Sequence, residues 1–244
     1  MSANKSPVPS QPEELPAETS SAGEVSEFLA KVKAMAPSPG AQTGRGRLMF
    51  AMDATMSRQP TWDRALQIQA EMFAETARIG GLDVQLVYFR GFGECQASKW
   101  VSDPTALARL MTKVDCRGGN TQIGKVLAHI RKEAAACKVN AVVYVGDCME
   151  EHLDRLCATA GEIGLLGVPV FMFQEGHDPI AEQAYREIAR LTRGAYCRFD
   201  QGSAKQLREL LSAVAVYAAG GCRALVEHIQ GGSGGATLLL EQLK

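Results

Sequence analysis

Hydroxyl and carboxylate side chains gather in three short segments of this sequence. Asp53, Thr55 and Ser57 alternate in the segment DATMS, so an extended backbone places their oxygens on one side. Thr121 follows two glycines in the segment CRGGNT, and Asp147 follows the apolar run AVVYV. Carboxylates and hydroxyls are hard oxygen donors, which Mg²⁺ prefers and which softer metals do not. These residue types predict a site for Mg²⁺ or Mn²⁺, provided that the fold brings the three segments together.

Segments of strand length and helix length alternate along the chain from Gly46 to Tyr217. Such alternation predicts an α/β fold: a doubly wound, mainly parallel, Rossmann-like sheet of about six strands with helices on both faces. Ligands of such sheets bind beyond the carboxyl ends of the strands, near the point where strand order reverses. The expected strands cover residues 47–52, 83–89, 99–101, 141–145, 169–173 and 195–199, and the expected helices cover 61–79, 104–112, 122–136, 152–165, 184–191 and 204–217.

The motifs DATMS, GGNTQIG and VGDC resemble the metal-ion-dependent adhesion site of von Willebrand factor A (VWA) domains in order and approximate spacing. The resemblance extends from about Gly46 to Tyr217 and leaves both tails outside it. It departs from the family pattern at Thr55, where a Ser is usual, and at Cys148, where many members have Gly. Neither departure removes a ligand oxygen.

The resemblance also implies a role for each residue of the site. Thr55 and Ser57 would bind the ion directly, and Thr121 directly or through water. Asp53 and Asp147 would act mostly through water or by hydrogen bonds to the ligands. The ion would keep an open position for an Asp or Glu side chain of a partner protein.

The predicted function is therefore a non-enzymatic, metal-dependent protein-binding module of a multiprotein assembly. By analogy with intracellular relatives, an ATPase or a chaperone is the expected kind of partner, in a bacterial-type cytosol. Two alternatives stay open. One is a metal-dependent hydrolase or phosphatase, which needs a general base beside the ion. The other is a metal-free scaffold, because an Asp after a strand or a Thr before a helix is also an ordinary helix cap.

The same segments match two enzyme motifs only in part. The stretch GNTQIGK satisfies most of a phosphate-binding loop, yet Val126 follows where a Ser or Thr should hold Mg²⁺. A phosphatase of the haloacid dehalogenase type needs a second Asp where Thr55 stands, and a threonine cannot transfer the proton at neutral pH. Cys148 is expected to be a small buried residue, since no base that would activate a nucleophile is evident.

Three charged residues lie next to the predicted site in the sequence. Glu150 and Glu151 are expected to start the next helix, where acids favour the dipole, or to shape the rim of the site. Arg58 is expected to steer an acidic partner toward the ion.

Composition argues against nucleic acid and membranes as partners. The net charge is -1 and aromatic residues make up 6% of the chain, so neither a basic surface nor a base-stacking platform is expected. The start of the chain contains no secretory signal, and no uninterrupted apolar stretch approaches the roughly 20 residues of a spanning helix. The seven cysteines form no C-x-x-C pair, which favours reduced thiols in a cytoplasmic protein.

Three regions are predicted along the chain. Residues 1–45 form a disordered tail and linker rich in Pro, Ser and Glu, with a short helix at 24–35. Residues 46–218 form the VWA-like domain. Residues 219–244 add a helical stretch, a GGSGG linker and the peptide ATLLLEQLK, which either binds another protein or folds back on its own domain.

Overall fold

The described part of the chain forms one sheet of six strands in the order β3-β2-β1-β4-β5-β6. The computed structural model describes residues 45–77, 80–199, 204–230 and 234–243; the predicted helix at 24–35 and residues 231–233 of the GGSGG segment lie outside them. Every neighbouring pair is parallel except β2 with β3. The predicted, mainly parallel α/β sheet is confirmed. The strands are β1 (Gly46–Asp53), β2 (Leu82–Arg90), β3 (Glu94–Ala97), β4 (Ala141–Gly146), β5 (Val170–Glu175) and β6 (Tyr196–Phe199).

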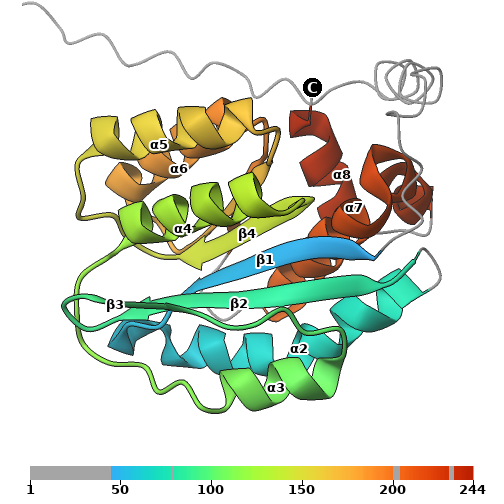
Figure 1. Ribbon diagram of the computed structural model, residues 1–244, viewed down its shortest axis with the longest axis horizontal. Coiled ribbons are helices and arrows are strands. Elements are labelled where there is room, and N and C mark those ends of the chain that lie inside the picture. Colours follow the sequence, from blue (N-terminus) through green and yellow to red (C-terminus); the bar gives the residue numbers. More distant parts are fainter. Residues whose placement is uncertain (1–44, 78–79, 200–203, 231–233, 244) are drawn as a thin grey trace, which may run out of the picture. The chain divides into compact units, whose positions relative to one another are not determined.

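Helices cover both faces of this sheet, as Figure 1 shows. One face is covered by α4, α5 and α6, and the other by α2, α3 and α7. This arrangement explains why β4 is buried at every residue and reads as a continuous apolar run. The helices are α2 (Gln59–Thr76), preceded by the 3₁₀ turn η1 (Met56–Arg58), α3 (Pro104–Met111), α4 (Ile123–Ala136), α5 (Leu153–Leu165), α6 (Pro179–Leu191), α7 (Ala204–Gln230) and α8 (Gly234–Gln242).

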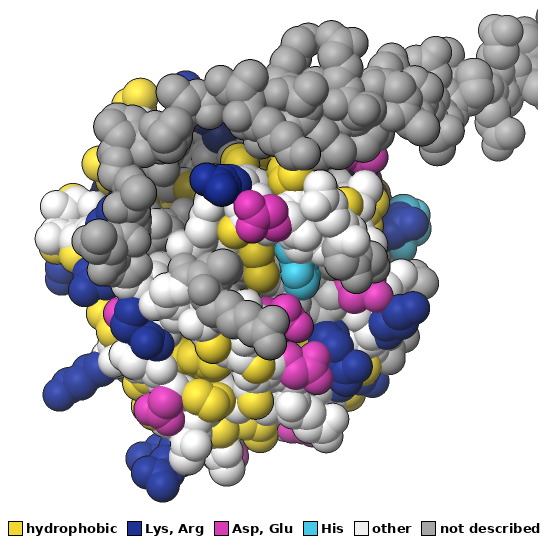
Figure 2. Space-filling model, turned by 90° about the vertical axis from the view of Figure 1, so that its right-hand side faces the viewer, with side chains coloured by type: hydrophobic (Ala, Val, Ile, Leu, Met, Phe, Trp, Pro, Cys, Tyr) yellow, Lys and Arg dark blue, Asp and Glu magenta, His cyan; other side chains and the backbone are white. Residues whose placement is uncertain are grey.

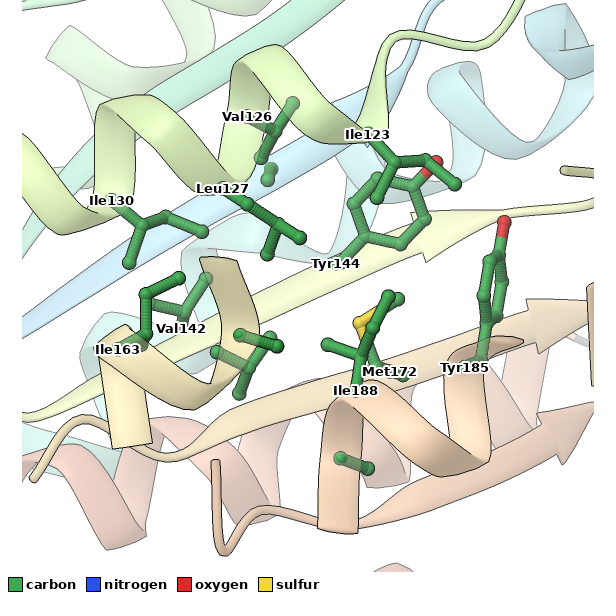
Figure 3. Packing of buried hydrophobic residues seen from close by; sticks show 14 of the residues in the cluster. Ile123, Val126, Leu127, Ile130, Val142, Tyr144, Ile163, Met172, Tyr185 and Ile188 are labelled. Atoms are coloured by element: carbon green, nitrogen blue, oxygen red, sulfur yellow. The ribbon is translucent and has the colours of Figure 1, made fainter. Parts of the chain in front are cut away.

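The helical stripe predicted on residues 122–136 packs into the core. Ile123, Val126, Leu127 and Ile130 of α4 are all buried and point toward the sheet (Figure 3). They recur at three- and four-residue spacing, so they lie on one face of the helix. Side chains of β4, β5, α5 and α6 complete this layer, which fixes the start of α4 above the carboxyl end of the sheet.

The predicted third strand at residues 99–101 is wrong. The strand at this edge is β3, which pairs antiparallel with β2 after the turn at Gly91 to Gly93. Val101 makes only an isolated bridge with Val84. Half of β3 is exposed, so its segment ECQA lacks the apolar alternation that marks a strand in the sequence.

The chain after Phe199 packs on the sheet and then on itself. Helix α7 is, among the described helices, the one long and apolar enough to cross a membrane; 56% of its apolar window is buried inside the domain. It contacts β1, β2 and β4, so its apolar residues belong to the core. Gly221 interrupts it with φ 68° and ψ -164°, values outside the helical region.

Helix α8 lies against α7 and reaches the edge strand β6. Leu239 and Leu240 are buried in this contact. The Gln242 side chain accepts a hydrogen bond from Tyr196 N at 2.7 Å and donates one to Tyr196 O at 2.7 Å. The peptide ATLLLEQLK was expected either to bind another protein or to fold back on its own domain. In the structure it folds back.

The side of the molecule on which the strands begin carries no large patch of one charge in the part that the structure describes (Figure 2). Apolar, acidic and basic side chains are interspersed there. This mixture matches the near balance of 26 basic and 27 acidic residues in the sequence.

Candidate metal centre

The two aspartates of the predicted site lie where the strand order reverses. Asp53 is the last residue of β1, and Asp147 directly follows β4. These strands are neighbours, with Met52 paired to Val145. The chain leaves β1 toward β2 on one side and later returns to β4 on the other. Ligands bind at this position in doubly wound sheets, so topology alone brings the two carboxylates to the expected place.

Asp53 is fully buried and only half satisfied. Its Oδ1 accepts a hydrogen bond from Thr55 N at 2.7 Å, whereas its Oδ2 has no hydrogen-bond partner. Burial raises the pKa of the Asp53 carboxyl to about 6, because desolvation penalises the charged form. The hydrogen bond from Thr55 and the charge of Arg58 lower the pKa of this carboxyl, but they do not outweigh the desolvation, and Oδ2 has no donor to stabilise it.

Thr55, Ser57 and Asp147 form a continuous chain of contacts at the same edge. The Thr55 and Ser57 hydroxyl oxygens lie 3.4 Å apart, and Ser57 Oγ donates to Asp147 Oδ2 at 3.0 Å. The turn η1 holds this geometry through Arg58 N, which donates to Thr55 O at 3.0 Å. Asp147 Oδ1 is buried and has no hydrogen-bond partner. The alternating hydroxyl residues of DATMS therefore lie in a row that ends at Asp147.

Thr121 is held by a residue that follows Asp147. Glu150 N donates to Thr121 Oγ1 at 3.0 Å, and Thr121 N donates to Glu150 Oε2 at 2.9 Å. Thr121 is buried, and its hydroxyl hydrogen bonds with Glu150 rather than with Ser57 or Asp147. The structure thus joins four of the five predicted residues directly and ties Thr121 to them through the loop after β4.

Arg58 is buried beside the site, which corrects the expectation that it steers a partner from the surface. Its side chain is 3% exposed, and its Nη1 is ion-paired with Glu175 Oε2. The same Nη1 lies 3.7 Å from Asp147 Oδ2. Glu175 ends β5, next to β4, and was not among the residues predicted from the sequence. Its position was the signal available in the sequence, because Glu175 is a carboxylate at the end of a third parallel strand.

Solved structures with the same architecture identify the fold. The structure is similar to a von Willebrand factor type A protein from Catenulispora acidiphila, with a TM-score of 0.55 and 14% identity over 70% of this chain and 43% of that chain. It is also similar to the SpRpn10 VWA domain, with a TM-score of 0.53 and 12% identity over 70% of this chain and 94% of that domain. The chain has the fold of a VWA domain.

A pilus adhesin is a further structural neighbour of this chain. The pilus adhesin SpaC of Lactobacillus rhamnosus GG, in its open conformation, has a TM-score of 0.56 and 11% identity over 72% of this chain and 30% of that chain. The chain thus spans less than half of SpaC and of the Catenulispora protein. No protein-family model matches the sequence. No curated protein matches it either.

The oxygen atoms of this VWA-fold site suit a hard divalent cation. Asp53 Oδ2 and Asp147 Oδ1 are buried acceptors without donors, and the Thr55 and Ser57 hydroxyls lie between the two aspartates. Mg²⁺ favours such oxygens and keeps several waters. The described residues hold no cluster of three or more His, Cys, Asp or Glu that could bind a metal, so hydroxyl oxygens are needed to complete a set of ligands.

The loop that presents Thr121 is fitted tightly against the ends of β1 and β2. Arg117 N donates to Ala54 O at 3.0 Å, and Asn120 N donates to Gly91 O at 3.3 Å. A Cβ atom on Gly119 would lie 2.1 Å from Gly91 O, a distance that real side chains do not reach. At Gly118 a Cβ would meet nothing within 4 Å. Only the second glycine is therefore required for the close approach of the two loops.

This difference predicts unequal effects of two neighbouring substitutions. Gly119→Ala is expected to lower the free energy of unfolding by about 2 kcal/mol, because the new methyl group overlaps main-chain atoms that must shift. Gly118→Ala is expected to change it by less than about 0.5 kcal/mol. Urea unfolding of both variants checks this, and equal stabilities would contradict the close contact of the two loops.

Glu151 caps a different helix from the one expected. Its carboxylate accepts hydrogen bonds from Ile123 N and Gly124 N, at the start of α4. Helix α5 begins at Leu153, so neither Glu150 nor Glu151 lies in its first turn. The expectation that they start the next helix is wrong. Glu151 does interact favourably with a helix N-terminus, but the helix is α4, and the contact joins the loop after β4 to it.

Cys148 remains a thiol in this environment. Burial and the neighbouring Asp147 raise the pKa of the Cys148 thiol to about 12. The reactive form of cysteine is the thiolate, which is negligible at neutral pH for such a group. Cys148 is only partly buried, so the prediction of a buried residue is not met, but its raised pKa argues against a nucleophilic role.

Proposed function

We propose that this chain is a metal-dependent, non-enzymatic protein-binding module. Asp53, Thr55, Ser57, Thr121 and Asp147 would hold one Mg²⁺ or Mn²⁺ ion. The bound ion would supply an electrophilic position that accepts a carboxylate of a partner protein. An Asp or Glu side chain exposed on the partner is the expected ligand.

One observation carries this proposal. Two buried carboxylate oxygens, Asp53 Oδ2 and Asp147 Oδ1, lack any hydrogen-bond partner at the edge of the sheet where the strand order reverses. Buried acceptors are rarely left unsatisfied, and each exception calls for an explanation such as an ion or ordered water. A divalent cation held by these residues, directly or through water, would supply the missing partner of each oxygen, and the Thr55 and Ser57 hydroxyls could serve as further ligands.

The surrounding residues prepare the site in distinct ways. Ser57 donates to Asp147, which orients that carboxylate toward the hydroxyl pair. Glu150 fixes both the amide and the hydroxyl of Thr121. The site is thereby preorganised, and ion binding needs little movement of the main chain.

The cellular setting follows by analogy with VWA domains. We infer a cytoplasmic, multiprotein assembly in which an ATPase or a chaperone provides the acidic ligand. All seven cysteines are free thiols, which suits a reducing compartment. Neither nucleic acid nor a membrane is needed as a partner.

Calorimetric titration with Mg²⁺ tests the site directly. The native protein is expected to bind Mg²⁺, and its unfolding free energy should rise by about 2.7 kcal/mol at a hundredfold excess over Kd. Ser57→Ala is expected to weaken binding at least about tenfold, because it removes one ligand oxygen and the hydrogen bond to Asp147. Thr159→Ala, which removes a hydroxyl exposed on α5, serves as the matched control.

Capture of an Asp- or Glu-bearing protein should then depend on the ion. Partner recovery is expected in Mg²⁺ and lost in EDTA or with Ser57→Ala. A protein that shows no heat of binding and no rise in melting temperature up to millimolar Mg²⁺ would refute the proposal and leave the metal-free scaffold.

A further inference from the structure

We propose that Arg58 is a resident cation of this site, which neutralises Asp147 and Glu175 in the metal-free domain and competes with the divalent ion for Asp147. The inference rests on the proposed function, since it concerns how tightly the same site binds its ion. On this inference, the buried guanidinium of Arg58 sets how tightly the site binds its metal ion.

Arg58 is placed to interact with both carboxylates. It follows Ser57 in the turn η1, and its Nη1 is ion-paired with Glu175 and lies 3.7 Å from Asp147 Oδ2. The Arg58 and Glu175 side chains are each 3% exposed. Water therefore screens this pair little, and each charge depends on the other for its stability.

Glu175 is held by more than Arg58. The Thr61 hydroxyl donates to Glu175 Oε2, and Arg64 Nη1 lies 3.9 Å from Glu175 Oε1. Arg64 is 28% exposed, so it is the more hydrated of the two guanidinium groups near this carboxylate. These contacts fix Glu175 in place, and Glu175 in turn anchors the guanidinium of Arg58 beside the candidate metal ligands.

The hydrogen bonds of Arg58 are incomplete, which distinguishes it from a purely structural ion pair. Its Nε and Nη2 are buried and have no hydrogen-bond partner, as is also true of Asp147 Oδ1. Arginine normally uses its planar fork to make paired hydrogen bonds with a carboxylate. Here the Asp147 contact is long and one-sided, so an ion can replace the guanidinium there while the Arg58–Glu175 pair persists.

The electrostatic consequence acts on the ion. A fixed positive charge near a ligand carboxylate repels a second cation, and the repulsion is strong where water is excluded. The same charge stabilises the metal-free domain, because it forms a buried ion pair with Glu175. Arg58 thus reduces both the need for a metal in folding and the affinity for it.

Arg58→Met removes the charge and keeps much of the side-chain volume. In EDTA its melting temperature is expected to fall by about 10 °C, since the buried ion pair between Arg58 and Glu175 is lost. Its affinity for Mg²⁺, measured by calorimetry, is expected to rise at least about tenfold over the native protein, since the repulsion is gone. Arg58→Lys keeps a positive charge and is expected to bind Mg²⁺ within about threefold of native.

The double variant Arg58→Met with Glu175→Gln keeps the test valid if the single variant does not fold. It removes both buried charges, so its melting temperature in EDTA should recover toward native while its affinity for Mg²⁺ stays raised. Native-like or weaker Mg²⁺ affinity in both charge-removed variants would overturn the competition while leaving the metal site intact. No Mg²⁺ binding by any of the four proteins would refute the proposed function and the competition together.

Discussion

Asp53→Asn is expected to stabilise the metal-free protein at pH 8. Burial raises the pKa of Asp53 from 3.8 to about 6. The folded state then binds the proton more tightly than the unfolded state, so stability falls as pH rises from about 4 to about 6. The difference of about 2 units corresponds to roughly 3 kcal/mol above pH 6. Asparagine carries no charge, so the variant should not lose this stability as the pH rises. Urea unfolding in EDTA between pH 4 and pH 8 measures the free energy of unfolding of both proteins.

The same variant is expected to lose all stabilisation by Mg²⁺. A bound ion would offset the buried negative charge of Asp53 in the native protein, whereas a neutral amide would attract the ion much less strongly. Mg²⁺ should thus raise the melting temperature of the native protein but not that of the variant. Asp63→Asn, at an exposed position in α2, is the control that should match native in every condition. A variant that retained both the native pH dependence and the Mg²⁺ response would exclude Asp53 from the site.

Leu239→Ala is expected to lower the free energy of unfolding by about 3 kcal/mol. Leu239 is 0% exposed where α8 meets α7, so its loss creates a cavity. The neighbouring Leu238 is 52% exposed, and Leu238→Ala should change stability by less than about 0.5 kcal/mol. Thermal melting of the two variants measures both effects, with about 10 °C expected for the first.

This pair of leucines also tests where the C-terminal peptide binds in solution. If α8 packs on its own domain, only the buried leucine affects folding. Two variants that melt like the native protein would instead indicate that the peptide spends its time away from α7, free for another protein.

The proximity of the candidate site residues could be predicted because it depends on general rules of topology. Apolar periodicity identified the segment that became α4, and apolar runs identified β1 and β4. Parallel strands align their carboxyl ends, so the residues after β1 and β4 had to meet. Asp53 and Asp147 were placed in this way without any knowledge of side-chain contacts.

The neighbours of the site could not be predicted, because they depend on contacts between distant segments. Arg58 resembles any exposed arginine in the sequence until β5 brings Glu175 beside it. Glu151 precedes α5 along the chain, yet it caps α4 across the loop. Local propensity carries no information about such pairs, since each partner is supplied by the packing of another element.

The hydrogen bonds of Gln242 attach the C-terminal helix to the edge of the sheet. A side-chain amide that engages both the N–H and the C=O of Tyr196 imitates one peptide group of a neighbouring strand. β6 is an edge strand, and unpaired edges can template pairing with other chains. The opposite edge is occupied by the short β3, of four residues. By occupying Tyr196, the tail protects the sheet against growth by strand addition, and its release would give an aggregating or swapping neighbour a place to begin.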